Sequence, residues 1–165
     1  MNRITAVCPG SFDPMTLGHL DIIKRASKMF SKVIVLVMNN MSKTSTFSAE
    51  ERVDMIKRSV KDLANVEVDC DDGLLADYIK KAGARAIVKG LRAVSDFEYE
   101  FQMALTNKKL CPEAETVFLT ADAENMYLSS SVVKQVGSVG GDIRDFVPAE
   151  IYEDIRLRLS IRKGQ

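Results

Sequence analysis

The sequence has little cysteine and histidine, the residues that build zinc sites and disulfide frameworks. Its three cysteines, Cys8, Cys70 and Cys111, lie far apart, and no C-x-x-C pair or cysteine and histidine cluster has the spacing of a zinc site. This pattern argues against a structural zinc site and against a disulfide framework. No cluster of carboxylates has the pattern of a tight metal site either. We therefore expect a reduced, cytoplasmic setting and no metal ion held tightly by protein side chains.

The chain also lacks net charge and long apolar runs. Lys+Arg and Asp+Glu each total 23 among 165 residues, which argues against binding nucleic acid or an anionic membrane through bulk charge. No apolar run is long enough to span a membrane, and the N-terminus has no apolar core of signal-peptide type. The composition is 46% hydrophobic and 28% charged, as in ordinary soluble proteins. The length predicts a single domain over residues 1–165.

Two common nucleotide-binding motifs are missing. No G-x-G-x-x-G follows the first apolar run, and no G-x-x-x-x-G-K-[ST] occurs anywhere. Dehydrogenase and P-loop interpretations therefore lose their main support.

The pattern that is present alternates short apolar runs with segments of helical periodicity. The strands are expected at residues 4–7, 33–38, 66–70, 86–89 and 116–119. The helices are expected at residues 20–30, 49–63, 74–82, 96–109, 129–136 and 148–162. This order predicts an α/β, Rossmann-like fold, with a five-stranded parallel sheet and helices on both faces. In such sheets ligands bind beyond the carboxyl ends of the strands, where five loops of this chain are expected to converge.

Several residues mark helix boundaries and buried faces. Ser48 and Glu51 form a capping box, Gly83 is expected to end a helix, and Ser129 is expected to start one. The first helix should bury one stripe of residues, Leu20, Ile22, Ile23, Ala26, Ser27, Met29 and Phe30.

The most distinctive stretch is V-C-P-G-S-F-D-P-M-T-L-G-H, residues 7–19. Its Pro and Gly residues predict a tight loop between a strand and a helix. Ser11 and Phe12 offer a hydroxyl and backbone N–H groups, and Gly18 allows close approach of a ligand. His19, the only histidine, falls in the first helical turn, where N–H groups and the helix dipole favour phosphate. An imidazole there can donate to a phosphate oxygen or shuttle a proton.

Other loops carry residues suited to phosphates. Lys43 lies in the polar loop 39–46, Lys89-Gly90-Leu91-Arg92 ends the fourth strand, and Ser129-Ser130-Ser131 opens a helix. Lys43 and the serine run also have plainer interpretations, because a loop lysine is often only solvated and one serine suffices as a cap.

The motif Pro9-Gly10-Ser11-Phe12-Asp13-Pro14, followed by Thr16-x-Gly18-His19, resembles the signature of the T/H-x-G-H nucleotidyltransferases. Within them the chain resembles the phosphopantetheine adenylyltransferases, and the match recurs at residues 47–52, 90–100 and 129–134. The resemblance implies transfer of the adenylyl group of ATP to 4′-phosphopantetheine, giving dephospho-coenzyme A and pyrophosphate in coenzyme A biosynthesis. It further implies in-line attack by the acceptor without a covalent intermediate, Mg²⁺ carried by ATP, and a homohexamer.

The resemblance also implies residue roles. His19, Lys43 and Arg92 are expected to act in catalysis, and Ser11, Lys43, Leu75 and Lys89 to contact the acceptor. The residues implied to contact ATP are Ser11, Phe12, Gly18, His19, Gly90, Leu91, Arg92, Glu100, Asn125, Met126, Tyr127, Leu128, Ser129, Ser130 and Ser131.

Two other functions stay open at this point. One is a nucleotidyltransferase of the same fold with another phosphorylated acceptor, and the other is an ATP-binding module without catalysis. Acceptor profiling and an assay of pyrophosphate release separate the three.

Overall fold

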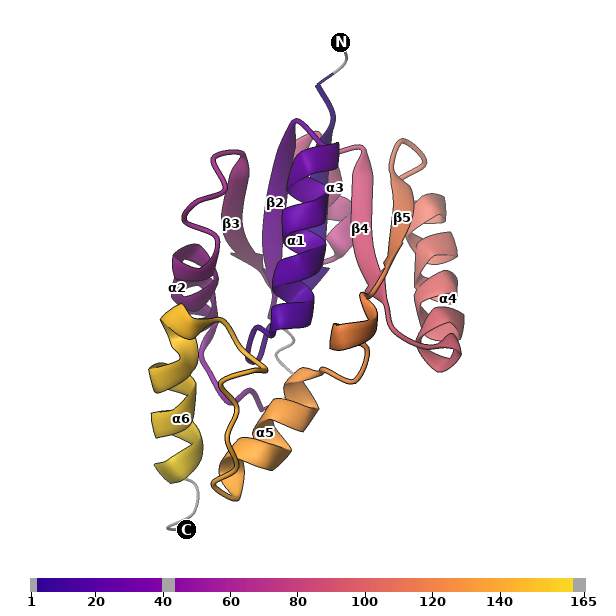
Figure 1. The fold of residues 1–165 in the computed structure, drawn as a ribbon. Coiled ribbons are helices and arrows are strands. Elements are labelled where there is room, and N and C mark those ends of the chain that lie inside the picture. The colour runs from indigo at the N-terminus through magenta and orange to yellow at the C-terminus, as the bar shows by residue number, and fades with distance from the viewer. Residues whose placement is uncertain (1–2, 40–43, 162–165) are drawn as a thin grey trace.

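A five-stranded, all-parallel sheet forms the centre of the molecule in the computed structural model, which describes residues 3–39 and 44–161 (Figure 1). The strands are β1 (Thr5–Gly10), β2 (Lys32–Met38), β3 (Val66–Asp71), β4 (Ala86–Leu91) and β5 (Glu115–Thr120). Their order across the sheet is β3-β2-β1-β4-β5, and every pair runs parallel. The predicted α/β, Rossmann-like class is confirmed.

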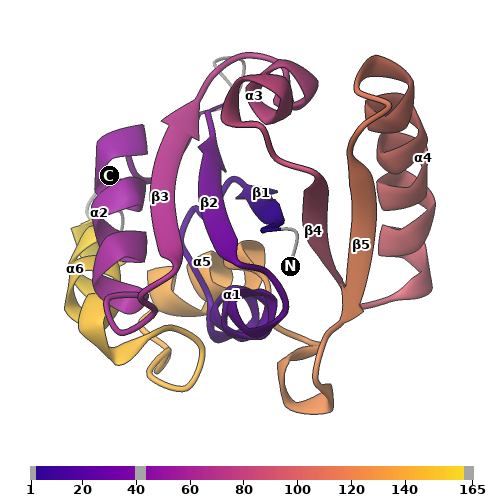
Figure 2. The same cartoon turned by 90° about the horizontal axis from the view of Figure 1, so that it is seen from above.

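The strand order reverses at β1. The chain builds outward from β1 through β2 to β3, then returns to pair β4 with the other side of β1 and adds β5 at the far edge. Loops that leave β1 and β4 therefore diverge in opposite directions, which opens a crevice at the carboxyl ends of these two strands. Figure 2 shows this order from above, with β1 between β2 and β4.

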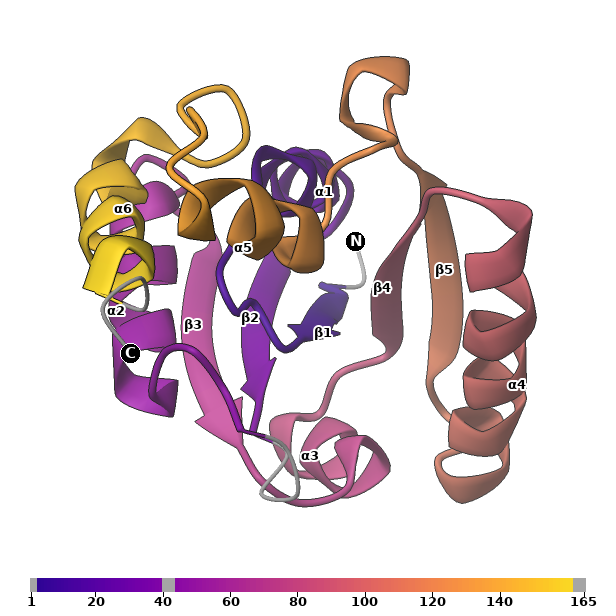
Figure 3. The same cartoon turned by 90° about the horizontal axis from the view of Figure 1, so that it is seen from below.

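Helices cover both faces of the sheet, as predicted. They are α1 (Leu17–Met29), α2 (Ala49–Ser59), α3 (Leu75–Ala82), α4 (Val94–Leu110), α5 (Ser130–Ser138) and α6 (Tyr152–Ile161). Figures 2 and 3 place α1 and α3 on opposite faces, and α4 beside the β5 edge. None of the helices in the described ranges has the length and the apolar character that crossing a bilayer requires.

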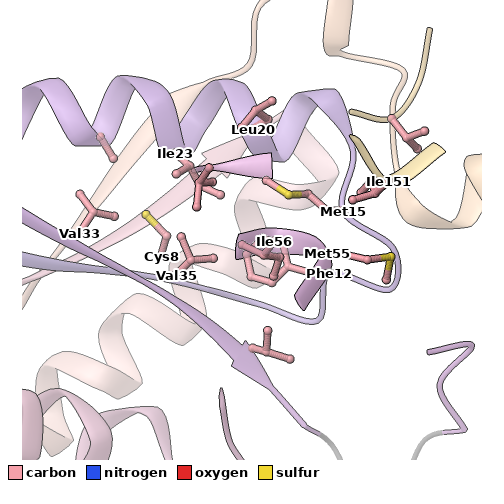
Figure 4. Close-up of a cluster of buried hydrophobic side chains, with 14 of the residues drawn as sticks. Cys8, Phe12, Met15, Leu20, Ile23, Val33, Val35, Met55, Ile56 and Ile151 are labelled. Atoms are coloured by element: carbon pink, nitrogen blue, oxygen red, sulfur yellow. The ribbon is translucent and has the colours of Figure 1, made fainter. Parts of the chain in front are cut away.

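The two faces of the sheet carry two separate cores. Val33, Val35 and Val37 of β2 pack toward α1 and α2, where they meet the side chains shown in Figure 4. Ile34 and Leu36 point the other way and pack against α3. All five are buried, because β2 is a central strand covered on both faces.

The predicted helix boundaries are borne out where capping residues mark them. The Ser48 hydroxyl accepts the Glu51 N–H, and the Glu51 carboxylate accepts the Ser48 N–H at 2.8 Å. Gly83 ends α3 with φ at +62°, and the Ser129 hydroxyl accepts the Val132 N–H at 3.1 Å. Predictions that rested on periodicity alone were less accurate, since α2 ends at Ser59 rather than near residue 63.

Two further expectations are wrong in detail. The last helical segment begins as a short 3₁₀ turn, Ala149–Ile151, before α6. Met29 was expected in the buried stripe of α1, but its side chain is 56% exposed. At 3.6 residues per turn, Met29 lies roughly 120° around the helix from the buried Ile23.

Gly83 offers a clean test of how α3 is terminated. A Cβ added at this position would meet nothing within 4 Å, so only the positive φ opposes a substitution. We expect Gly83→Ala to lower the free energy of unfolding by about 1 kcal/mol, and Gly83→Asn by less, because asparagine tolerates the left-handed conformation better. Urea denaturation measures both, and an alanine variant as stable as the parent would contradict this account.

Candidate active site

A cavity of about 720 Å³ lies at the carboxyl ends of β1 and β4. Its walls come from the loop after β1, residues 44 and 45 before α2, the end of β4 with the start of α4, and the stretch after β5. The predicted site residues that line it are Ser11, Phe12, Gly18, His19, Lys89, Gly90, Arg92, Glu100, Asn125, Leu128, Ser129, Ser130 and Ser131. Loops from four of the five strands thus meet at one place.

The cavity wall does not include every predicted residue. Leu75 packs against the core under α3, and Leu91 is half-buried within β4. Met126 and Tyr127 are exposed. The turn after β3 also stays outside the wall, because β3 is an edge strand three places from β4. Lys43 lies outside the described residues, and the roles of all these residues stay predictions.

His19 is oriented by Thr16, the residue that caps α1. The His19 N–H bonds to the Thr16 hydroxyl, while His19 Nδ1 lies 3.0 Å from the Thr16 backbone nitrogen. A backbone amide can only donate, so Nδ1 is the acceptor in this pair. The ring proton of neutral His19 is therefore on Nε2. In effect His19 occupies the position that glutamate takes in the usual capping box.

The surroundings keep this imidazole neutral. The pKa of His19 is lowered from 6.5 to about 4, mainly by burial and in smaller part by the positive charges of Arg92 and Lys89. A neutral ring with Nε2–H is a hydrogen-bond donor at physiological pH but a poor source of a full proton. The arrangement therefore suits donation to a phosphate oxygen better than proton shuttling.

Three lysine or arginine side chains in the wall are each paired with an acid. Lys89 Nζ lies 3.3 Å from Glu100 Oε1, Arg92 Nε lies 3.3 Å from Asp96 Oδ2, and Lys134 Nζ lies 3.5 Å from Asp13 Oδ2. Arg92 also donates to the Leu128 carbonyl at 2.6 Å, which ties the end of β4 to the stretch after β5.

Gly90 lets β4 approach α1 closely. A Cβ at this position would lie 3.0 Å from Cγ1 of Ile22, on the helix that carries His19. A side chain at this position would crowd the Ile22 side chain, which would have to shift by a few tenths of an ångström to make room.

The N-terminus of α5 closes another side of the cavity. Ser129 caps the helix, and the Ser130 hydroxyl donates to the Pro14 carbonyl at 2.7 Å. This bond joins α5 to the loop after β1. The first N–H groups of a helix have no acceptor inside it, so those of Ser130 and Ser131 can meet an anion.

The wall residues that were not singled out from the sequence include Asp13, Thr16, Arg52 and Lys134. Asp13 is buried, and its carboxylate accepts the N–H groups of Thr46 and Phe47, both at 2.9 Å. All four lie inside the matching blocks of the family motif, which was the available signal.

Cys8 also lines the cavity, but its thiol is held in the protonated form. Burial raises the pKa of Cys8 to about 12, although the positive charge of Lys89 acts in the opposite direction. The side chain therefore stays a thiol, which is a weak nucleophile. In the described ranges, no three His, Cys, Asp or Glu side chains gather so that they could hold a metal ion.

The single histidine makes the pKa shift directly measurable. We expect the His19 ring signals to titrate near pH 4 by NMR, instead of near the ordinary pKa of 6.5. Between these values the unfolded chain binds more protons than the folded one, so the free energy of unfolding falls as the pH drops from 6.5 toward 4.

In Arg92→Gln the pKa of His19 should rise only part of the way back to 6.5, because burial is the larger cause of the shift.

A matched variant isolates the contribution of this residue. Below pH 6.5 the parent loses free energy of unfolding because His19 takes up a proton more readily in the unfolded chain. In His19→Gln this part of the pH dependence should be absent, and denaturant unfolding at several pH values measures it. A His19 ring that titrates near 6.5 would contradict the neutral-donor interpretation.

Comparisons with known proteins agree with this geometry. The cytidylyltransferase-like family matches residues 7–136. The chain is 55% identical to phosphopantetheine adenylyltransferase of Dictyoglomus turgidum, over 96% of this chain and 99% of that protein. It is 57% identical to the enzyme of the same name from Clostridium botulinum strain 657, over 96% of this chain and 97% of that protein.

Solved structures share the fold at low identity. Plasmodium falciparum nicotinic acid mononucleotide adenylyltransferase, complexed with NaAD, superposes with a TM-score of 0.69 at 13% identity, over 99% of both chains. The bifunctional NMN adenylyltransferase/ADP ribose pyrophosphatase of Francisella tularensis gives 0.72 at 17% identity, and this chain spans 52% of its length. These two likenesses concern the fold alone, whereas the family follows from the close relatives. The chain belongs to the cytidylyltransferase-like family and, within it, to the phosphopantetheine adenylyltransferases.

Proposed function

We propose that this protein transfers the adenylyl group of ATP to 4′-phosphopantetheine, giving dephospho-coenzyme A and pyrophosphate. The observation that carries the proposal is the neutral Nε2–H donor of His19, which lies near Lys89 and Arg92 where β1 and β4 end. Such a set of donors suits a reacting phosphate, and the family membership names the acceptor class.

The reaction needs no protein nucleophile. An oxygen of the acceptor phosphate attacks the α-phosphorus of ATP, the bond from that phosphorus to the bridging oxygen breaks, and pyrophosphate leaves with the electron pair. The Cys8 thiol, with its raised pKa, is not suited to form a covalent intermediate. The work of the chain is then to orient two phosphates and to stabilise the charge that develops between them.

Residues around the cavity divide this work. His19 and Arg92 stabilise charge on the α- and β-phosphates, and the N–H groups of Ser130 and Ser131 hold further phosphate oxygens at the start of α5. Ser11 and Lys89 hold the attacking phosphate, and Lys43 is proposed to act with them.

ATP enters as its Mg²⁺ complex in this proposal. The wall contributes three carboxylates, Asp13, Asp96 and Glu100, and each is paired with a lysine or an arginine. Oxygens of the ATP phosphates are therefore the ligands available to the ion, with few from the protein. Mg²⁺ carried by ATP would supply positive charge that stabilises the leaving pyrophosphate.

We further propose that the chain acts as a homohexamer in the cytoplasm. Support for assembly comes from α4, whose apolar side chains Phe97, Phe101 and Leu105 are exposed, Leu105 at 57%. Exposed apolar side chains on one helix are typical of a surface that another protein covers. Sedimentation showing a monomer at micromolar concentration would remove this part of the proposal.

The activity is tested by measuring pyrophosphate release from Mg-ATP with and without 4′-phosphopantetheine. We expect release only with the acceptor, and a product with the mass of dephospho-coenzyme A. Release only with another phosphorylated acceptor would assign a related nucleotidyltransferase. ATP binding with no release for any acceptor would assign a non-catalytic module.

His19→Ala tests the central residue of the site. Loss of one preorganised donor to a developing charge typically costs about 10²–10³ in rate, so kcat should fall by roughly that factor. Thermal unfolding at pH 7 serves as the control that the variant stays folded. A fall of less than about tenfold would remove His19 from the mechanism.

A further inference from the structure

Arg52 is the largest fully buried side chain in the described part of the molecule. It lies on α2, is 1% exposed, and forms part of the cavity wall. Its guanidinium donates to three neutral acceptors: the Ser48 carbonyl at 3.2 Å, the Ser11 carbonyl at 2.9 Å, and Oδ1 of Asn39 at 2.9 Å. A full positive charge is thus held inside the protein by uncharged groups.

This arrangement differs from that of the other basic side chains in the wall. Lys89, Arg92 and Lys134 each face an acid at 3.3 to 3.5 Å. The ion pairs between residues in the ranges 3–39 and 44–161 do not include Arg52. A buried charge without a counter-ion is costly and is normally paired. The surroundings of Arg52 therefore favour an anion that comes from outside the chain.

One of the three acceptors connects Arg52 to the motif loop. The Ser11 carbonyl and the Phe12 N–H belong to the same peptide group, and in a planar trans peptide these two groups point in opposite directions. With the oxygen directed at Arg52, the Phe12 N–H is directed away from it. Among the described residues this N–H has no hydrogen-bond acceptor, and Phe12 lines the cavity.

The hydrogen bond also changes the strength of that donor. A cation that donates to a carbonyl draws electron density toward the oxygen, and the N–H of the same peptide becomes more positive. Phe12 itself has a positive φ of 49°, which is uncommon for a bulky residue and needs support from neighbouring contacts. The bond from Arg52 to the Ser11 carbonyl provides such support.

We propose that Arg52 is a positioning residue that aims and polarises the Ser11–Phe12 peptide toward a bound polyphosphate, and that this polyphosphate supplies the counter-ion that the described residues do not place beside its charge. The inference rests on the proposed binding of ATP and adds a residue that acts through the backbone. The inference connects α2 to the phosphate site through the Ser11–Phe12 peptide, although the Arg52 side chain itself is buried.

The test compares ligands with and without phosphates. Calorimetry measures the affinities of ATP and of adenosine for the parent, Arg52→Gln and Arg52→Lys. In Arg52→Gln we expect the Kd for ATP to rise by about tenfold or more, as for a lost charge-assisted hydrogen bond, while the Kd for adenosine stays within about twofold. Arg52→Lys keeps the charge but loses the planar fork, so its affinity for ATP should be intermediate.

Arg58→Gln is the matched control. Arg58 lies on the same helix, carries the same charge and bonds to Asp54 and Asp154 outside the cavity. We expect it to bind both ligands as the parent does. Equal losses of ATP and adenosine in Arg52→Gln would indicate a merely structural role and would overturn the proposal, as would an unchanged affinity for ATP.

A measurement on the parent protein covers the case in which the Arg52 variants do not fold. Titration with inorganic triphosphate, followed by amide NMR, should move the Phe12 N–H signal downfield. Binding of triphosphate that leaves this signal unmoved would overturn the inference while leaving the proposed activity intact. A parent that binds neither ATP nor triphosphate would overturn both.

Discussion

The carboxylate of Asp13 holds together the two segments on which the cavity wall depends. It lies in the loop after β1 and accepts the N–H groups of Thr46 and Phe47, which lead into α2. From the other side, Arg158 of α6 donates to the Thr46 carbonyl at 2.7 Å and stacks over the Phe47 ring. The segment before α2 is therefore fixed by residues near both ends of the chain. Without the Asp13 carboxylate, two buried N–H groups would lack an acceptor.

Most of the fold could be predicted because local chemistry and hydrophobic pattern agree in this chain. The run at residues 33–38 predicted a strand covered on both faces, and the buried β2 confirms it. Ser48, Gly83 and Ser129 predicted helix ends because each acts through a backbone bond or conformation of its own. Periodicity alone misplaced Met29 and the end of α2, since it does not show where a helix leaves the core.

The site was less predictable, and the reason differs between residues. His19 could be found because a lone histidine after Gly18 at a helix start is unusual, and it lines the cavity. The hydrogen bond from the Thr16 N–H to the His19 ring could not be predicted, because the usual capping box has glutamate or glutamine at the position of His19. Arg52 has the same spacing as its apolar neighbours Met55 and Ile56, and only tertiary structure distinguishes a buried arginine from a solvated one.

The paired acids of the cavity wall have a consequence for ligand choice. Glu100, Asp96 and Asp13 already satisfy Lys89, Arg92 and Lys134, so an arriving anion must compete with a carboxylate at each of them. A small ion such as inorganic phosphate can replace one carboxylate and gains little by doing so. A chain of linked phosphates that reaches more than one of these cations replaces several carboxylates, and its second and third contacts then form at a high effective concentration. The wall thereby favours anions by their length as well as by their charge.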